Sequence, residues 1–455
     1  MRLRLAPPFR LSLLLLAPAL LSGQAPVDSA LAEYIATIRA IDTHAHPMLP
    51  VSSGAPADTD FDALPLDGIP PFGFPHRLTL DDPIWRGAQA ALYGVPVAAS
   101  DSVAYRKALT GAVASAINAR GLHFPEWALD RAGVDIMLAN RVAMGPGLSG
   151  PHFRWVSFVD ALMLPLDTRG EARTPDTHVL YPKEAKLLQR YLRALNLTRL
   201  PTTLDGYVRT VVVPTLDRQR AGGAVAVKFE AAYLRPLDFD DPDPAVAARV
   251  YAQYASGGTP TRAEYKELED YLFRAIAREA GLRGMAVQIH VLETFGSYYR
   301  SAGAAPHLLE AAFNDSTLRG TKFIVTHGGW PLVNETQALL AKPNVYADIS
   351  AMDLILSPTE LASVLRQWLG EFPDKVLFGS DAFDGGAEQG WEQVAWVGSM
   401  TARRALAISL SGMLSDGEIT RSRAEMLARM VLRENAIAAY RLRGADYRPP
   451  NAWNK

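Results

Sequence analysis

The chain has 455 residues, of which 49% are hydrophobic and 21% are charged, the composition of an ordinary globular protein. Its length exceeds that of a usual single core, although large α/β barrels reach this length as one domain. The net charge of -2 and the isoelectric point near 6.5 argue against nucleic acid or an acidic membrane as a partner. We therefore expect a small-molecule substrate at a local site. Whether the protein forms a homo-oligomer is left open by the sequence.

The first 25 residues have the pattern of a secretory signal peptide. Arg2 and Arg4 precede an apolar run over residues 11–21, which is too short to cross a bilayer and is followed by small residues. We expect cleavage between Ala19 and Ala30 and an exported protein, periplasmic or secreted, with no membrane contact once the signal is removed. The alternative is an uncleaved N-terminal anchor.

Cysteine is absent from the whole chain. Its absence excludes disulfides, thiol nucleophiles, thiolate metal sites and a lipoprotein anchor after the signal. Any metal ion must therefore be bound by nitrogen and oxygen atoms.

Apolar runs of strand length alternate with helical patterns along the chain. After a short amphipathic helix over 29–39, the first strand is expected at Ile41–His46. The next segment, 47–78, is rich in proline and glycine, and its Phe72 and Phe74 favour a packed lid over a linker. A helical region follows over 83–131. The further strands are expected at 134–138, 154–162, 224–230, 285–290, 322–327, 344–350 and 375–381, with helices at 182–195 and 261–280 between them and closing helices at 391–414, 416–430 and 433–442.

Eight strands separated by helices predict a (β/α)8 TIM barrel over residues 29–445, with a lid-like insertion after strand 1 and extra C-terminal helices. The alternative is an open doubly wound sheet. No glycine-rich phosphate-binding turn follows an early strand, and this absence argues against the open sheet.

Polar residues with ligand chemistry recur where the predicted strands end. In a barrel of parallel strands all these ends open on one face, where such enzymes place their active sites. One buried histidine at a strand end is usually structural, but a whole series favours a metal site. The series is His44 and His46 on strand 1, Lys228 on strand 4, His290 on strand 5, His327 on strand 6 and Asp381 on strand 8.

This order of residues resembles the amidohydrolase superfamily of metal-dependent (β/α)8 barrels. The runs Ile324–Pro331, Val345–Ser350 and Leu377–Asp381 are similar to the amidohydrolase-related group that contains aminocarboxymuconate-semialdehyde decarboxylase and the barrel fused to glutamine-synthetase-like proteins. Ala132–Asp135 is similar but less specific. The resemblance covers residues 41 to about 383 and does not name a substrate.

The resemblance implies that His44, His46, His290 and Asp381 bind one divalent ion, for which zinc is the expected metal. Asp381 would also act as base and then as acid, moving a proton from the attacking water to the leaving group. His327 would act as a base or polarise the substrate. In a two-metal version, a carboxylated Lys228 would bridge the ions while His290 and His327 bind the second; the one-metal version is preferred.

Four residues are expected to contact the substrate: Arg235, Lys228, Tyr233 and Trp330. The leading hypothesis for function is a metal-dependent hydrolase acting on an amide, lactone or related C–N or C–O bond. A non-oxidative decarboxylase or a sugar-acid isomerase would use the same ligands. A catalytically inactive binding protein is the third hypothesis, against which the complete ligand set argues.

Overall fold

The computed structural model describes residues 27–51, 56–96, 103–292, 295–386 and 388–442. The predicted signal peptide, residues 1–25, and the last residues of the predicted domain lie outside this described part.

Eight parallel strands form one sheet in the order of the sequence, β1-β2-β3-β4-β5-β6-β7-β8. Their bounds are β1 Ala40–Ala45, β2 Val134–Arg141, β3 Phe153–Phe158, β4 Ala224–Phe229, β5 Ala286–His290, β6 Phe323–Thr326, β7 Val345–Asp348 and β8 Val376–Leu377. The backbone that follows β8 then pairs with β1. Thr43 N donates to Phe378 O at 3.0 Å and His46 N donates to Ala382 O at 2.7 Å. The predicted TIM barrel is therefore confirmed, and its seam runs between the first and last strands.

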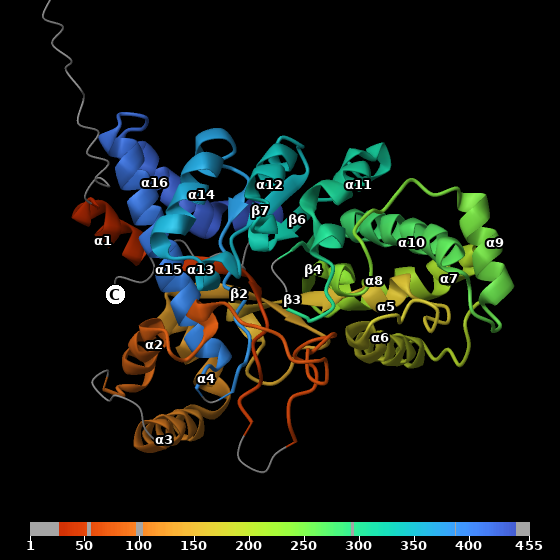
Figure 1. The fold of residues 1–455 in the computed structure, drawn as a ribbon, viewed down its shortest axis with the longest axis horizontal. Helices are drawn as coiled ribbons and strands as arrows, with labels where there is room; N and C mark the ends of the chain where they lie inside the picture. Colours follow the sequence, from red (N-terminus) through yellow and green to blue (C-terminus); the bar gives the residue numbers. More distant parts are fainter. Residues whose placement is uncertain (1–26, 52–55, 97–102, 293–294, 387, 443–455) are drawn as a thin grey trace, which may run out of the picture.

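Helices surround the barrel, as Figure 1 shows. Their bounds are α1 Ser29–Thr37, α2 Pro83–Tyr93, α3 Val103–Arg120, α4 Phe124–Ala132, α5 Asp160–Met163, α6 Pro175–Ala194, α7 Leu204–Tyr207, α8 Val213–Ala221, α9 Pro244–Tyr254, α10 Arg262–Leu282, α11 Glu310–Asn314, α12 Val333–Leu340, α13 Met352–Ile355, α14 Pro358–Glu371, α15 Trp391–Ser415, α16 Arg421–Arg429 and α17 Asn435–Ala439. The N-terminal helix α1 lies beside α16 at the other end of the chain, and its Ile35 carbonyl accepts a hydrogen bond from Arg403 of α15 at 2.7 Å. The described residues contain no helix long and apolar enough to cross a membrane.

The end of the barrel away from the predicted site is filled by apolar side chains. Ile41, Ile136 and Ile324 come from three different strands and form one buried cluster. Ala436, Ala439 and Tyr440, from α17 and the residue after it, complete this cluster. Helix α17, the last helix of the described residues, therefore packs across the bottom of the barrel, and the cavity with the predicted ligands lies at the opposite end.

Three predicted elements differ clearly from the structure. The strand expected over 375–381 is only the two residues Val376–Leu377, and the backbone after it pairs with β1. The strand expected over 154–162 ends at Phe158, and α5 follows, because the period of a short buried apolar run does not separate strand from helix. The helix expected from Pro182 begins at Pro175. Thr174 and Thr177 form a capping box there, and the helix continues through Pro182.

Candidate metal centre and substrate cavity

Three of the predicted ligands meet at the carboxyl end of the barrel. His44, His46 and Asp381 each offer an atom such that all three atoms lie within 4.8 Å of one another. Asp381 Oδ1 is 3.1 Å from His44 Nε2 and 3.7 Å from His46 Nε2. Two imidazole nitrogens and one carboxylate oxygen are a common protein donor set for a small divalent cation.

The backbone fixes this group at the seam of the barrel. Asp381 N donates to His44 O at 2.8 Å, and Asp381 adopts a φ of +52°, which is uncommon for a residue with a side chain. Gly379 packs closely behind the site, since a Cβ there would lie 3.1 Å from the Cβ of Ser350 and 3.2 Å from the Cβ of His44. The ligand carboxylate is thus held against the first strand by the hydrogen bonds that close the barrel.

Gln288 of β5 orients His44. Its amide nitrogen donates to Thr43 O at 2.6 Å and to Tyr440 Oη at 2.8 Å, so its oxygen faces Asn140 Nδ2 at 2.9 Å and His44 Nδ1 at 3.2 Å. An amide oxygen only accepts, which places the proton of His44 on Nδ1 and leaves the Nε2 lone pair for an ion. Burial lowers the pKa of His44 well below its usual value, so the imidazole is neutral, as a metal ligand must be.

His290 and His327 form a second pair beside the first group. His290 Nδ1 and His327 Nε2 are 3.1 Å apart, and burial lowers the pKa of both imidazoles well below the usual value. His290 is therefore near the three ligands but is not within the compact set. Its Nε2 is buried, and within the described residues it has no hydrogen-bond partner.

His327 is held on its other side by the end of β7. Its Nδ1 is 3.0 Å from Ser350 Oγ and 3.9 Å from Asp381 Oδ2, and its backbone N donates to Asp348 Oδ1 at 2.9 Å. Ser350 Oγ donates to the same carboxylate oxygen at 2.5 Å. His327 thus lies between a fixed hydroxyl and the ligand carboxylate.

Lys228 is fully buried below the two groups. Its Nζ is 3.2 Å from His44 Nε2, and burial lowers the pKa of the ammonium from its usual value. The side chain is not part of the cavity wall. It therefore faces His44 of the ligand set and does not line the cavity that the described residues form.

A cavity of about 350 Å³ opens above the ligands. His44, His46, His290, His327 and Asp381 form part of its wall. Its apolar walls come from Phe61, Phe72, Phe74, Phe295 and Phe383. Phe72 and Phe74 belong to the insertion after β1, and their rings lie 5.6 and 5.2 Å from that of Phe295. The predicted packed lid is thus present and makes the cavity largely apolar.

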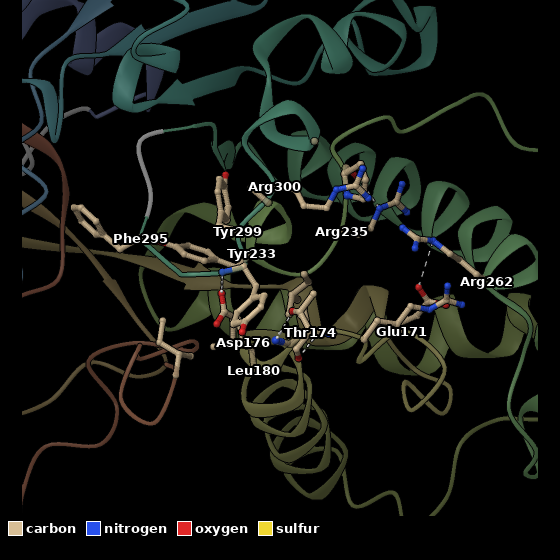
Figure 2. A pocket seen from close by; sticks show the side chains of 18 residues that line it. Glu171, Thr174, Asp176, Leu180, Tyr233, Arg235, Arg262, Phe295, Tyr299 and Arg300 are labelled. Carbon is tan, nitrogen blue, oxygen red and sulfur yellow. Dashed lines mark hydrogen bonds and ion pairs between the residues drawn. The ribbon is translucent and has the colours of Figure 1, made fainter. Parts of the chain in front are cut away.

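A second pocket of about 220 Å³ adjoins this cavity, and the two share Tyr233 and Phe295. Figure 2 shows these two rings at one end of the pocket and Glu171 and Arg262 at the other. Arg300 also lines the pocket, is exposed, and has no ion pair with another described side chain. The pocket therefore offers a positively charged group at some distance from the ligands.

The substrate-binding predictions have different outcomes. Tyr233 lines both cavities, and its ring centroid is 4.7 Å from that of His290. Arg235 lines only the second pocket, and its guanidinium already binds Glu269 at 2.8 Å and Asp270 at 2.9 Å. Trp330 lies outside the walls of both cavities as the described residues form them. Only Tyr233 is therefore placed to contact a molecule above the ligands.

Sequence reasoning missed the polar residues that support the site. Asn140, Gln288 and Ser350 each lie on or directly after a strand, but their interior position depends on strand register, which periodicity did not resolve. Asp62 and Glu230 also line the cavity. Asp62 lies in a loop and gave no sequence signal, while Glu230 follows Lys228 by two residues and could have been noticed.

No curated protein matches the chain, but solved structures and a family model do. A protein described as a metal-dependent hydrolase from Lactobacillus casei ATCC 334 has a TM-score of 0.56 at 16% identity, over 90% of this chain and 97% of its own. Glucuronate isomerase from Caulobacter crescentus has a TM-score of 0.55 at 13% identity, over 92% of this chain and 95% of its own. Uronate isomerase from Thermotoga maritima has a TM-score of 0.53 at 14% identity, over 90% of this chain and 96% of its own. These likenesses show the shared barrel. The family model "Amidohydrolase" matches residues 41–442, and the chain therefore belongs to the amidohydrolase family.

Proposed function

We propose that this protein is an exported, zinc-dependent hydrolase that cleaves an amide, lactone or related C–N or C–O bond of a small, largely apolar molecule. The observation that carries the proposal is the compact group of His44, His46 and Asp381 on the wall of the 350 Å³ cavity. Export is proposed from the first 25 residues of the sequence alone.

The donor atoms fit a zinc ion. Both histidines present Nε2 toward Asp381, and thiolate, the other common zinc donor, is absent from the chain. A divalent cation bound there supplies Lewis acidity, which polarises an oxygen of water or substrate. His290 has a buried, unpartnered Nε2 near the group and is the candidate for a fourth contact.

Asp381 and His327 are the residues that we assign to proton transfer. Asp381 directs Oδ1 at the two ligand imidazoles and leaves Oδ2 3.9 Å from His327 Nδ1. The carboxylate can take a proton from the attacking water and pass it to the leaving atom. His327 is neutral and contacts Ser350 through Nδ1 and His290 through Nε2, so to act as a base or to polarise the substrate it must exchange one of these partners for the substrate or the attacking water.

The cavity walls support an apolar acyl or aromatic group as the part of the substrate beside the ligands. Five phenylalanines line this space, and hydroxyl groups of a sugar acid would lack partners against them. This is the reason for preferring hydrolysis of an apolar substrate over sugar-acid isomerisation. We propose that a polar or anionic end of the substrate extends past Tyr233 toward Arg300 in the second pocket (Figure 2).

The test is an activity screen of the zinc-loaded mature protein against N-acyl amino acids, γ-glutamyl amides, lactones and aromatic acids. We expect release of an acid and an amine or alcohol, and loss of turnover after chelation. Release of carbon dioxide, or conversion of a uronate without bond cleavage, would overturn the proposed reaction. The inactive variant His44→Ala provides the background rate.

A further inference from the structure

We propose that Asp62, in the insertion after β1, is a positioning residue that orients His46 for the metal ion. We further propose that segment 58–62 is a strap that carries Asp62 to this place. The inference rests on the proposed metal site and concerns how the chain holds one ligand of it. Three aspartates alternate in this segment, and each binds a different partner.

The first aspartate anchors the strap to the barrel. Asp58 accepts two hydrogen bonds from Arg141, at 2.8 and 3.0 Å, and both side chains are almost fully buried. Arg141 is the last residue of β2 and also donates to Pro47 O at 2.6 Å. The start of the insertion is therefore bound to the strand next to β1 by a bidentate buried pair.

The second aspartate has a partly exposed side chain, and the strap contacts the barrel there through the backbone. Asp60 forms two hydrogen bonds with Arg190 of α6, at 2.5 and 3.0 Å, and its carbonyl accepts from Val142 N at 2.8 Å. This pair is at the surface, with 44% of the Arg190 side chain and 31% of the Asp60 side chain exposed. Such a pair contributes little to stability, so Asp60 offers a matched control.

The third aspartate faces the ligand. Asp62 Oδ2 is 3.5 Å from His46 Nδ1, which is buried and has no hydrogen bond to any described residue. A buried N–H without an acceptor is unfavourable, so a small inward movement of the strap that formed this hydrogen bond would be stabilising. Since His46 turns Nε2 toward Asp381, a proton on Nδ1 is what a neutral ligand imidazole requires. A carboxylate on the far nitrogen is the usual partner of a metal-binding histidine.

The same atoms allow another interpretation, which we do not favour. His46, Asp62 and Glu230 also form a compact group that could hold a second ion. However, a neutral imidazole has one lone pair, and His46 cannot offer Nδ1 to a second ion while Nε2 binds the first. The geometry thus assigns Asp62 to the orientation of His46.

The experiment compares zinc binding by the wild type, Asp62→Ala, Asp62→Asn and the control Asp60→Ala, using competition with a chromophoric chelator and direct metal analysis. We expect Asp62→Ala to weaken zinc binding about 10–100-fold, the usual effect of removing such a partner. Asp62→Asn keeps a hydrogen-bond acceptor without the charge, so its zinc affinity should lie between those of the wild type and Asp62→Ala. Asp60→Ala should change the affinity less than about 2-fold because its ion pair is exposed. Cobalt-substituted protein should show an altered visible spectrum for Asp62→Ala and an unaltered one for Asp60→Ala.

Two results would overturn the inference. One is equal zinc affinity for Asp62→Ala and Asp60→Ala in folded protein, as judged by circular dichroism. The other is two zinc ions per wild-type chain and one per Asp62→Ala chain with unchanged affinity, which would make Asp62 a ligand. A wild type that binds no metal would instead refute the proposed function, so the two failures are distinguishable.

Discussion

The substitution Gln288→Leu should weaken both the fold and the metal site. Gln288 is fully buried in the barrel and makes four hydrogen bonds, to Thr43 O, Tyr440 Oη, Asn140 Nδ2 and His44 Nδ1. Leucine has a similar size, so the volume is kept while all four partners lose their bond. Each polar group left buried and unpaired is destabilising by about 1–3 kcal/mol.

The four losses do not simply add, because the remaining groups can partly rearrange. We expect a decrease in the free energy of unfolding on the order of 4 kcal/mol in the metal-free protein. His44 also loses the acceptor that fixes its proton on Nδ1, so zinc affinity should fall about 10–100-fold.

Urea unfolding followed by tryptophan fluorescence measures the first effect, and chelator competition measures the second. Gln219→Leu is the matched control, because Gln219 is also buried but, among the described residues, its side chain makes only one long hydrogen bond, of 3.5 Å, to Tyr191. It should change stability by less than about 1 kcal/mol and leave zinc binding unchanged. If Gln288→Leu matched this control in both measurements, the assigned hydrogen-bond network would be refuted.

Three further predictions concern catalysis, specificity and pH. Asp381→Asn should lower kcat about 10²–10⁴-fold on a substrate found by the screen; turnover within 3-fold of the wild type in zinc-loaded protein would contradict the proton-transfer role. Arg300→Gln should raise KM for substrates with an anionic end and leave neutral analogues of equal length unchanged, and equal KM changes for both would disprove the contact. Burial raises the pKa of Glu269, beside Arg235, to about 7. Because this folded-state pKa lies above the unfolded value, the buried carboxyl stabilises the fold while it is protonated and loses this contribution as the pH rises. In urea unfolding, the free energy of unfolding of the wild type should therefore fall relative to that of Glu269→Gln as the pH rises from 5 to 8. A rise over the same range would refute the raised pKa of Glu269.

The residues at strand ends could be placed from sequence because their position depends only on the order of strands. His44, His46 and Asp381 follow this rule, and the barrel brings them together. Whether His290 joins the compact group of His44, His46 and Asp381 depends on the rotation of its side chain and on a few ångströms of separation from that group. No sequence pattern encodes either of these. Similarly, Arg235 was expected to bind substrate, but Glu269 and Asp270 come from α10, and their approach is a matter of tertiary packing.

The supporting residues were harder to predict for a different physical reason. Gln288 lies on β5, a strand that was predicted from its apolar residues. A single polar residue in such a run could face either the inside or the outside of the barrel. Asp62 lies in the insertion, where the path of the backbone depends on the buried ion pair of Asp58 with Arg141 and on the backbone hydrogen bond from Val142 N to Asp60 O. Loops of this kind are positioned by specific side-chain contacts, and these are not periodic.

The seam of the barrel has a consequence for the order in which the protein matures. His44 comes from the first strand and Asp381 follows the last, and Tyr440, still later in the chain, supports His44 through Gln288. The ion-binding group therefore cannot be complete until nearly the whole polypeptide has been synthesised and its two ends have met. Metal loading is consequently a late step, and its rate should report on closure of the barrel.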